Sequence, residues 1–303
     1  MSLGEKTRLC RIRLDWIDFD LTGLEIVPVY PQNMLFLDGS SHFGNQIVVN
    51  ESDLFVVPEG FPNLLPALQA TKCQTVVLAQ GASYIWLTLS KGERWSDYGV
   101  KNVITTSREI ERNINLTMPL IQTHNYYYSI NRDLFSCPPV GEKKKEIVYL
   151  INRGPRQEEA LQSILKIFRL AFPRWEETGW TFVKLANITR QEFATRLKQA
   201  TFALVIDDYV GLPIFPLEAM ACGTHVIGWP GIGGNEHVRP DSGHWSPQHS
   251  LLPTAEMINQ ALIDWETGQL NDRTTVYEDI LSQFTPEKEQ ESILRIFSIL
   301  KGE

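Results

Sequence analysis

Short apolar runs alternate with amphipathic stretches along the chain from residue 52 onward. The runs are rich in Val, Ile and Leu, which is typical of strands buried in parallel sheets. These predicted strands are 54–57, 75–79, 100–105, 120–123, 147–151, 181–185, 202–206 and 224–229. The stretches with helical spacing are 61–70, 158–172, 190–199, 216–221, 254–265 and 287–300, with a further helix after Ser107. This alternation predicts an α/β chain whose parallel sheets are covered by helices on both faces.

Polar residues and glycine mark where several of these helices begin and end. Ser107, Thr189 and Thr254 stand at predicted starts, and their hydroxyl groups can accept a hydrogen bond from the first turn. Gly223 follows the short helix 216–221, and glycine readily adopts the left-handed conformation that ends many helices. We therefore expect these residues to be helix caps.

The most informative stretch runs from Thr201 to Val238. Its first strand ends at Asp207 and Asp208, two charges that a central strand could not bury. A loop with Gly211 leads into the short helix, where Pro216 fits the first turn, and a second loop with several glycines follows the next strand. Both loops leave the carboxyl ends of parallel strands, which is where open α/β sheets bind ligands.

Two segments of this stretch carry a family resemblance. Residues 216–224 read PLEAMACGT, and residues 233–236 read GGNE. Together they resemble the donor-site signature of the group-1 family of retaining glycosyltransferases, which have the GT-B fold of two Rossmann-like domains facing across a cleft. The family pattern is a glutamate, seven residues and a second glutamate. The second glutamate is Glu218, placed early in its helix where the dipole favours a carboxylate, and the resemblance implies that it holds the ribose hydroxyls of a nucleotide.

The first glutamate of the pattern is replaced by Val210 in this chain. In the family that glutamate lies beside the transferred sugar, so nucleotide binding is better supported here than transfer. Asp207 and Asp208 face the same side and are candidates for the missing carboxylate, although either could be a solvated acid at a strand end. The donor-binding residues expected from the stretch are Gly211, Leu217, Glu218, Gly233, Gly234, Asn235 and Glu236.

Cationic residues stand in a second loop that could meet a donor diphosphate. Arg153 and Arg156 follow the strand 147–151, and guanidinium groups bind phosphate oxygens bidentately. The family places an arginine and a lysine in this loop. Arg153 matches the arginine, whereas Glu158 occupies the position of the lysine. Arg156 could take the role of that lysine. The alternative is two exposed loop arginines with no ligand.

His124 is the third candidate for a catalytic role, because it follows the predicted strand 120–123 and could point into the cleft. A lone histidine is more often structural than catalytic, so that alternative stays open. Asp18 and Asp20 form a DxD pair, the metal-binding mark of another glycosyltransferase fold, but they lie too early in the chain to serve it. We therefore expect no metal site.

The length of 303 residues favours two domains. We predict an amino-terminal, acceptor-side domain over residues 1–138 and a nucleotide-sugar-binding domain over residues 139–303, whose last helix returns to the first domain. Residues 8–50 show no early glycine-rich loop of the family type, so the amino domain is expected to be reduced or to lack its first unit. Ser136–Gly141 and the charged run Lys143–Lys145 read as the linker.

The composition argues against some classes of partner and site. A formal charge of −8 and a pI near 5.4 argue against a nucleic-acid-binding surface. The amino terminus has no apolar leader and no run approaches the length of a membrane span, so we expect a cytoplasmic protein without a transmembrane segment. The four cysteines are scattered without a close pair, which indicates neither a disulfide framework nor a zinc site.

The function expected from the resemblance is transfer of a hexose from a nucleoside-diphosphate sugar to an acceptor hydroxyl, with retention of configuration and without a metal. The nucleotide sugar is the co-substrate and no other cofactor is expected; the acceptor, whether a glycan, a lipid-linked molecule or a small molecule, is not identified. Two alternatives remain. One is a non-catalytic GT-B protein that binds a nucleotide sugar or a partner, and the other is a nucleotide-sugar isomerase.

Overall fold

The computed structural model describes residues 10–11, 35–36, 51–138, 143–151, 155–207, 211, 214–270 and 272–302. The chain divides into two compact units. The smaller unit comprises Met1–Asp53 with Thr71–Gln74, and its described strands β1 (Cys10–Arg11) and β2 (Leu35–Phe36) form a parallel pair. The larger unit comprises Leu54–Ala70 with Thr75–Glu303 and holds the two main sheets. The boundary that the sequence predicts at residue 138 stays a prediction.

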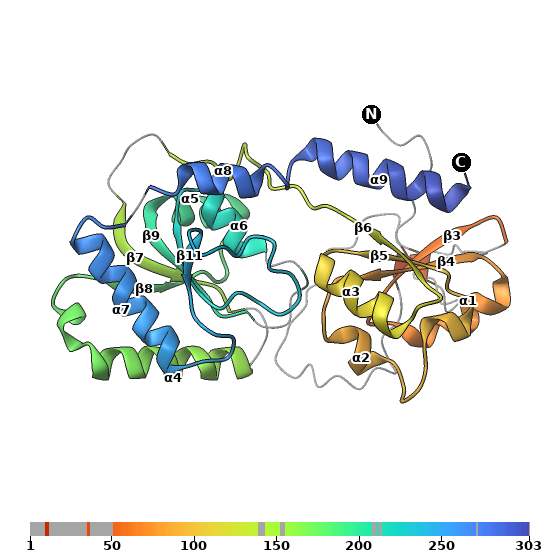
Figure 1. The fold of residues 1–303 in the computed structure, drawn as a ribbon, viewed down its shortest axis with the longest axis horizontal. Helices are drawn as coiled ribbons and strands as arrows, with labels where there is room; N and C mark the ends of the chain where they lie inside the picture. The colour runs from red at the N-terminus through yellow and green to blue at the C-terminus, as the bar shows by residue number, and fades with distance from the viewer. Residues whose placement is uncertain are drawn as a thin grey trace. The chain divides into compact units, whose positions relative to one another are not determined.

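The first main sheet has the order β3-β4-β5-β6, so β6 is an edge strand (Figure 1). The pairs β4–β5 and β5–β6 are parallel. Its strands are β3 (Leu54–Pro58), β4 (Gln74–Ala79), β5 (Asn102–Thr105) and β6 (Gln122–Asn125). Its helical elements are η1 (Pro62–Leu64), α1 (Leu65–Thr71), α2 (Tyr84–Thr88), η2 (Trp95–Tyr98) and α3 (Arg108–Thr117).

The second sheet is parallel throughout, with the order β11-β10-β9-β7-β8. Its strands are β7 (Lys144–Tyr149), β8 (Thr181–Lys184), β9 (Ala200–Val205), β10 (His225–Gly228) and β11 (Gly243–Trp245). Counted from β7, this is the doubly wound order 2-1-3-4-5. The winding direction therefore reverses between β7 and β9, and a ligand site is expected outside the carboxyl ends of these two strands.

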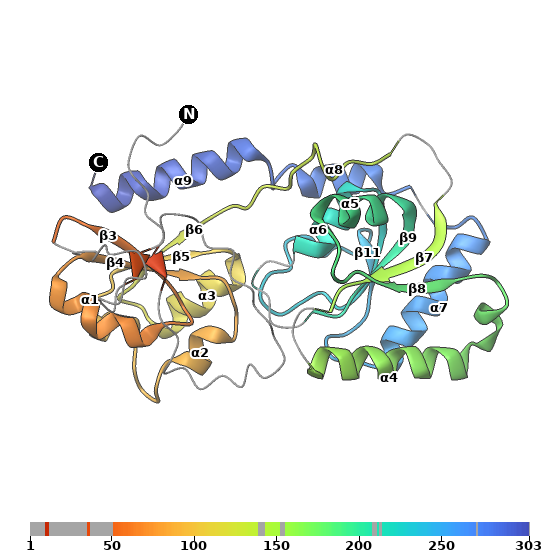
Figure 2. The ribbon, with the colours of Figure 1, turned by 180° about the vertical axis from the view of Figure 1, so that it is seen from behind.

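Helices cover both faces of the second sheet (Figure 2). They are α4 (Pro155–Ala171), η3 (Pro173–Glu176), α5 (Arg190–Gln199), α6 (Ile214–Ala221), α7 (Leu252–Glu266) and α8 (Thr274–Leu281). Side chains of β9 alternate between the two faces, as the pleat of a strand requires. Phe202 and Leu204 pack in the core with α4 and α7, whereas Ala203 and Val205 pack with α5, α6 and α8. The fully buried β9 is thus the centre of this half.

The last helix, α9 (Pro286–Lys301), packs on the first sheet rather than the second. Ile296 and Leu300 share a core with Val76 of β4 and Ile104 of β5. The carboxylate of Glu289 also accepts hydrogen bonds from the hydroxyl groups of Tyr126 and Ser129. None of the described helices is long and apolar enough to cross a membrane.

The α/β prediction is confirmed, and three of the four predicted caps are present. Ser107 accepts a hydrogen bond from the backbone N–H of Ile110 at 3.2 Å, and Thr189 forms a capping box with Glu192. Gly223 ends α6 with φ +64°, the left-handed conformation expected of it.

Other local predictions were wrong. Helix α7 begins at Leu252, so Thr254 lies inside it; its hydroxyl accepts the indole N–H of the buried Trp229 at 2.9 Å. Helix α6 begins at Ile214, before Pro216, which leaves Glu218 beyond the first turn. The charged run expected in the linker contributes its last two lysines to β7.

Candidate functional site

The loops after β9 and β10 meet outside the carboxyl ends of the second sheet. Asp207 stands two residues beyond the end of β9, and its carbonyl accepts a hydrogen bond from the side-chain amide of Gln248 at 3.4 Å. The amide oxygen of Gln248 in turn accepts the backbone N–H of Gly231 at 3.0 Å. One glutamine side chain therefore links the two loops that the sequence analysis selected as a ligand site.

Gly211 brings the loop after β9 against the loop after β4. Its backbone N–H donates to the carbonyl of Gln80 at 2.8 Å. A Cβ at this position would lie 2.0 Å from that carbonyl oxygen and 2.5 Å from Cδ1 of Ile110. Only glycine permits such a close approach of two backbones.

The loop after β10 contacts the amino terminus of α3. The hydroxyl of Ser107 donates to the carbonyl of Gly233, and a carboxylate oxygen of Glu236 accepts the backbone N–H of Arg108 at 2.9 Å. A carboxylate is favoured at this end of a helix, because the free N–H groups and the helix dipole are positive there. A Cβ on Gly234 would lie 1.9 Å from the carbonyl oxygen of Gly211, so the two glycine loops are also in close contact.

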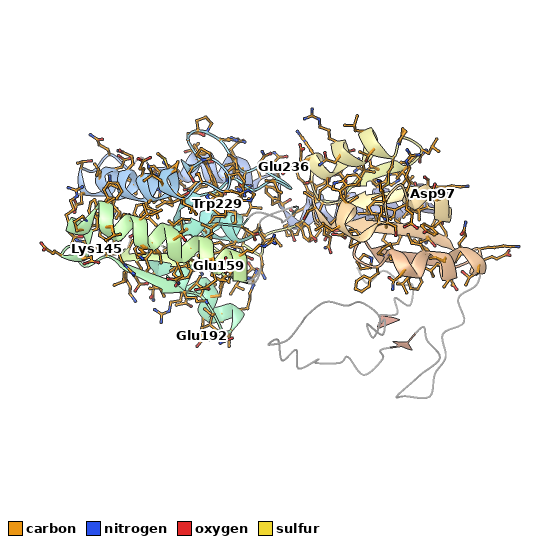
Figure 3. All side chains as sticks on the ribbon, turned by 90° about the horizontal axis from the view of Figure 1, so that it is seen from below. Asp97, Lys145, Glu159, Glu192, Trp229 and Glu236 are labelled. Atoms are coloured by element: carbon orange, nitrogen blue, oxygen red, sulfur yellow. The ribbon has the colours of Figure 1, made fainter. Side chains whose placement is uncertain are left out.

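Glu236 therefore has a partner that the sequence did not suggest. Glu236 is labelled in Figure 3. One oxygen caps α3, whereas Oε2 is buried and has no hydrogen-bond partner among the described residues. That oxygen is an unused acceptor beside the glycine loop. Asn235 next to it is exposed, and its carbonyl accepts the N–H of Val238 at 2.9 Å.

Glu218 is buried and forms an ion pair with Arg190, the first residue of α5. Both guanidinium terminal nitrogens donate to it, one of them to Oε2 at 3.2 Å. The guanidinium also lies over the ring of Phe135 at 4.5 Å, where cation–π attraction holds it. Burial raises the pKa of the Glu218 carboxyl, and the bonds from Arg190 act in the opposite direction.

The remaining predicted residues of the second half are dispersed. The side chain of Leu217 is fully buried in the core, so only its backbone could reach a ligand. Arg156 is exposed in the first turn of α4. Glu158, at the lysine position of the family, forms an ion pair with Lys184 at 2.9 Å. Arg153, Asp208 and Val210 lie outside the described residues.

His124 lies within β6, where its Nε2 is 2.8 Å from Oδ1 of Asn102. Burial is the main cause that lowers the pKa of this histidine, and the positive charge of Arg295 on α9 lowers it further. No contact in the described part of the chain joins it to the loops after β9 and β10. His124 instead lines a pocket between α3, β6 and α9.

No family model matches the chain. A similar curated protein is the alpha-1,6-glucosyltransferase of Actinobacillus pleuropneumoniae serotype 7 (strain AP76), with 25% identity over 234 residues that span 75% of this chain and 68% of the relative. Among solved structures, sucrose-phosphate synthase from Thermosynechococcus elongatus matches with a TM-score of 0.61 and 17% identity, over 82% of this chain and 74% of the other. S. aureus TarM, in complex with fondaparinux, alpha-GlcNAc-glycerol and UDP, matches with a TM-score of 0.61 and 12% identity, over 88% of this chain and 55% of the TarM chain.

The chain has the GT-B fold of these glycosyltransferases. The pneumococcal O-GlcNAc transferase GtfA, solved with UDP and GlcNAc, has the same fold, with a TM-score of 0.59 and 13% identity over 84% of this chain. The likeness to the solved structures concerns the fold alone. This GT-B chain spans 55% of the TarM structure and 57% of the GtfA structure.

Besides the partner of Glu236, sequence reasoning missed the contacts of Arg190, Gln80 and Gln248 in this GT-B chain. The capping box at Thr189 could have placed Arg190 at the start of a helix, but no spacing links it to Glu218. Gln80 and Gln248 lie in loops whose partners are distant in sequence, so their roles follow only from the three-dimensional structure.

Proposed function

We propose that this chain transfers a hexose from a nucleoside-diphosphate sugar to an acceptor hydroxyl, with retention of configuration and without a metal ion. The observation that carries the proposal is the pairing of the buried Glu218 with Arg190, in a chain whose two glycine loops meet at the carboxyl edge of a doubly wound sheet. Support comes from the related glucosyltransferase and from the UDP in two of the similar structures. A cytoplasmic location is part of this proposal and rests on the sequence.

In this proposal Glu218 binds the ribose. An ionised carboxylate has about four acceptor positions, and the two hydrogen bonds from Arg190 leave others for ribose hydroxyls. Arg190 fixes the orientation of the carboxylate, and its hydrogen bonds favour the ionised form against the effect of burial on the pKa. The nucleotide would then be held in one register, which is a positioning role.

The donor diphosphate would lie between the first turn of α4 and the loop after β10. Arg156, with Arg153, supplies positive charge where the leaving diphosphate becomes more negative, so that a metal ion is not required. Backbone N–H groups of Gly233 and Gly234 would face the phosphate oxygens. Glu236, in the same loop, would lie near the sugar.

A second function is favoured by one specific residue. Val210 stands where the family pattern has a glutamate beside the sugar, and valine cannot accept a hydrogen bond. Without compensation by Asp207 or Asp208, the chain would bind a nucleotide sugar without transferring it. Such a protein could act as a binding subunit.

The test is incubation of the purified chain with uridine, adenosine and guanosine diphosphate hexoses that carry a labelled sugar, followed by separation of the products. Labelled glycoside, or free hexose released in water, supports a transferase. Bound but unchanged donor supports the second function. Epimerised donor would contradict both, and so would the absence of binding to every donor.

A further inference from the structure

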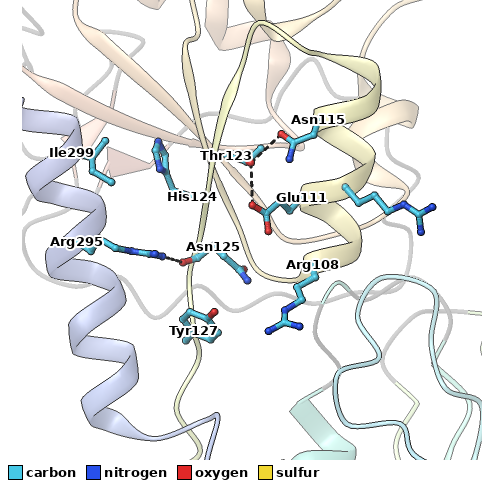
Figure 4. A pocket seen from close by; sticks show the side chains of 10 residues that line it. Arg108, Glu111, Asn115, Thr123, His124, Asn125, Tyr127, Arg295 and Ile299 are labelled. Atoms are coloured by element: carbon cyan, nitrogen blue, oxygen red, sulfur yellow. Dashed lines mark hydrogen bonds between the residues drawn. The ribbon is translucent and has the colours of Figure 1, made fainter.

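A polar pocket of about 570 Å³ opens along the edge strand β6 (Figure 4). Its walls are α3 on one side and α9 on the other, with the strand as its floor. The lining residues are Arg108, Glu111, Arg112, Asn115, Thr123, His124, Asn125, Tyr127, Arg295 and Ile299. Of these residues, only His124 was a candidate from the sequence, for a catalytic role, and none was a candidate for donor binding.

Three arginines and a single carboxylate line the pocket, in a chain whose formal charge is −8. Arg295 reaches in from α9 and donates to the carbonyl of Asn125 at 3.2 Å, whereas Arg108 approaches from α3 (Figure 4). The carboxylate of Glu111 lies 3.3 Å from the hydroxyl of Thr123 instead of pairing with an arginine. Among the described residues, no carboxylate lies within ion-pair distance of the three guanidinium groups.

The fold does not need this arrangement. Arg108 and Arg112 are four residues apart on α3, where like charges weaken a helix rather than stabilise it. On α9, Arg295 follows Glu291 by four residues, yet its guanidinium is turned to the backbone of β6. Arg108, Arg112 and Arg295 line this hollow without a carboxylate partner among the described residues, and guanidinium groups are well suited to bind oxoanions.

Arg108 also connects the pocket to the candidate donor site. Its side chain lines the pocket, and its backbone N–H is bonded to Glu236 in the glycine loop. A molecule in the pocket could therefore extend toward the place where the proposed function puts the donor sugar. In this proposal the donor binds to the part of the chain with the second sheet. An acceptor must therefore approach the donor sugar from the part that holds the first main sheet.

We propose that the pocket between α3, β6 and α9 binds an oxoanion, a phosphate or a carboxylate, carried by the acceptor. The inference rests on the proposed function and names the acceptor class: a negatively charged saccharide rather than a neutral one. The arginines hold its anionic group and leave a hydroxyl free to meet the donor. Free inorganic phosphate shares the chemistry of the anion but not the sugar that would reach the donor site.

The experiment is calorimetric titration of the full chain, saturated with a nucleoside diphosphate, with glucose 6-phosphate, glucose and inorganic phosphate. The wild type should bind glucose 6-phosphate more tightly than either of the others, and added salt should weaken the binding. The double variant Arg112→Gln/Arg295→Gln should lose about tenfold or more in affinity for glucose 6-phosphate, because it lacks two charged donors. The control variant Arg196→Gln removes an exposed arginine of α5 and should leave the affinity for glucose 6-phosphate unchanged.

Equal affinity of the double variant and the wild type for glucose 6-phosphate would overturn the inference, as would the absence of binding. Phosphate that binds as tightly as glucose 6-phosphate would overturn the acceptor role, since the sugar would then contribute nothing. Nucleoside diphosphate affinity, measured first, shows that the variant is folded. Its absence in the wild type would count against the proposed function, whereas normal nucleotide binding with an unaltered sugar-phosphate affinity would count against this inference alone.

Discussion

Arg190 donates to both carboxylate oxygens of Glu218, although the two residues stand 28 positions apart on different helices. The carboxylate is nearly inaccessible, with 4% of its side chain exposed, whereas 58% of the arginine side chain is exposed. Burial alone would favour the protonated carboxyl. The hydrogen bonds from Arg190 oppose this rise in the pKa and so favour a negative charge at the place where the ribose is proposed to bind.

The first prediction is that Arg190→Gln destabilises the protein more at neutral pH than at low pH. In the variant, burial raises the pKa of Glu218 and no arginine opposes the rise. Above the ordinary carboxyl pKa, the folded state then holds a proton that the unfolded state has released. The unfolding free energy should therefore fall as the pH rises above the ordinary carboxyl range. Breaking a buried pair costs about 3–5 kcal/mol, and the exposure of Arg190 reduces this to about 1–2 kcal/mol.

Urea denaturation at pH 4 and pH 7.5 measures this effect. The difference in unfolding free energy between the wild type and Arg190→Gln should be small at pH 4 and should reach its full size of about 1–2 kcal/mol at pH 7.5. Arg196→Gln, on the same helix but without an ion pair among the described residues, is the control and should show little change at either pH. A gap of the same size at both pH values would mean that the charge of Glu218 is not what Arg190 stabilises.

The second prediction concerns the phosphate end of the site. Replacing Arg153 and Arg156 with glutamine should weaken binding of a nucleoside diphosphate far more than binding of the nucleoside, because the lost partners are phosphate oxygens. Higher salt should weaken diphosphate binding to the wild type through screening. Competition binding with the two ligands decides this, and an equal loss for both would exclude the loop as the phosphate site.

The third prediction tests the contact between the glycine loops. In Gly234→Ala the new Cβ would lie 1.9 Å from the carbonyl of Gly211, so the loop must shift away from α3. We expect a loss of about 1–3 kcal/mol of unfolding free energy, as for other overpacked sites. Gly60→Ala, whose Cβ would meet nothing within 4 Å, is the control and should stay within about 0.5 kcal/mol of the wild type. Similar stabilities of the two variants would show that the loop is not held where the structure has it.

The fourth prediction concerns catalysis. If the carboxylate that the family has near the sugar is absent, Val210→Glu should raise transfer or donor hydrolysis with little change in nucleotide affinity. If Asp207 or Asp208 compensates, the variant should gain nothing, and changing that aspartate to asparagine should reduce turnover of the wild type. Product analysis with labelled donor distinguishes these cases. Rapid transfer by the wild type that survives asparagine at both positions would contradict this account of the site.

What the sequence could predict was local. Ser107 and Thr189 were found as caps because a cap depends only on the residues within the next turn. Thr254 was misjudged because Pro253 already fits the first turn of α7, and the threonine hydroxyl bonds to Trp229 instead. Strand β11 was missed because three residues, Gly243–Trp245, are too short for a recognisable apolar run.

Only part of the candidate site could be predicted from the sequence, because sequence patterns report local structure. Its glycines and Glu218 form one continuous stretch, so their pattern could be read directly. The groups that surround them come from distant positions: Arg190 from α5, Ser107 from α3 and Gln80 from the loop after β4. No local spacing encodes such contacts, and they follow only when the sheets are assembled.

The central claim is that Glu218 anchors a nucleotide sugar, and titration of the wild type and Glu218→Ala with the best-binding nucleotide sugar tests it most directly. The wild type should bind, and the variant should lose about 1.5–3 kcal/mol, the range for hydrogen bonds to a charged group, or roughly tenfold to a hundredfold in dissociation constant. The circular dichroism spectrum shows whether the variant is folded. An unchanged affinity in a folded variant, or a wild type that binds no nucleotide sugar, would contradict the claim.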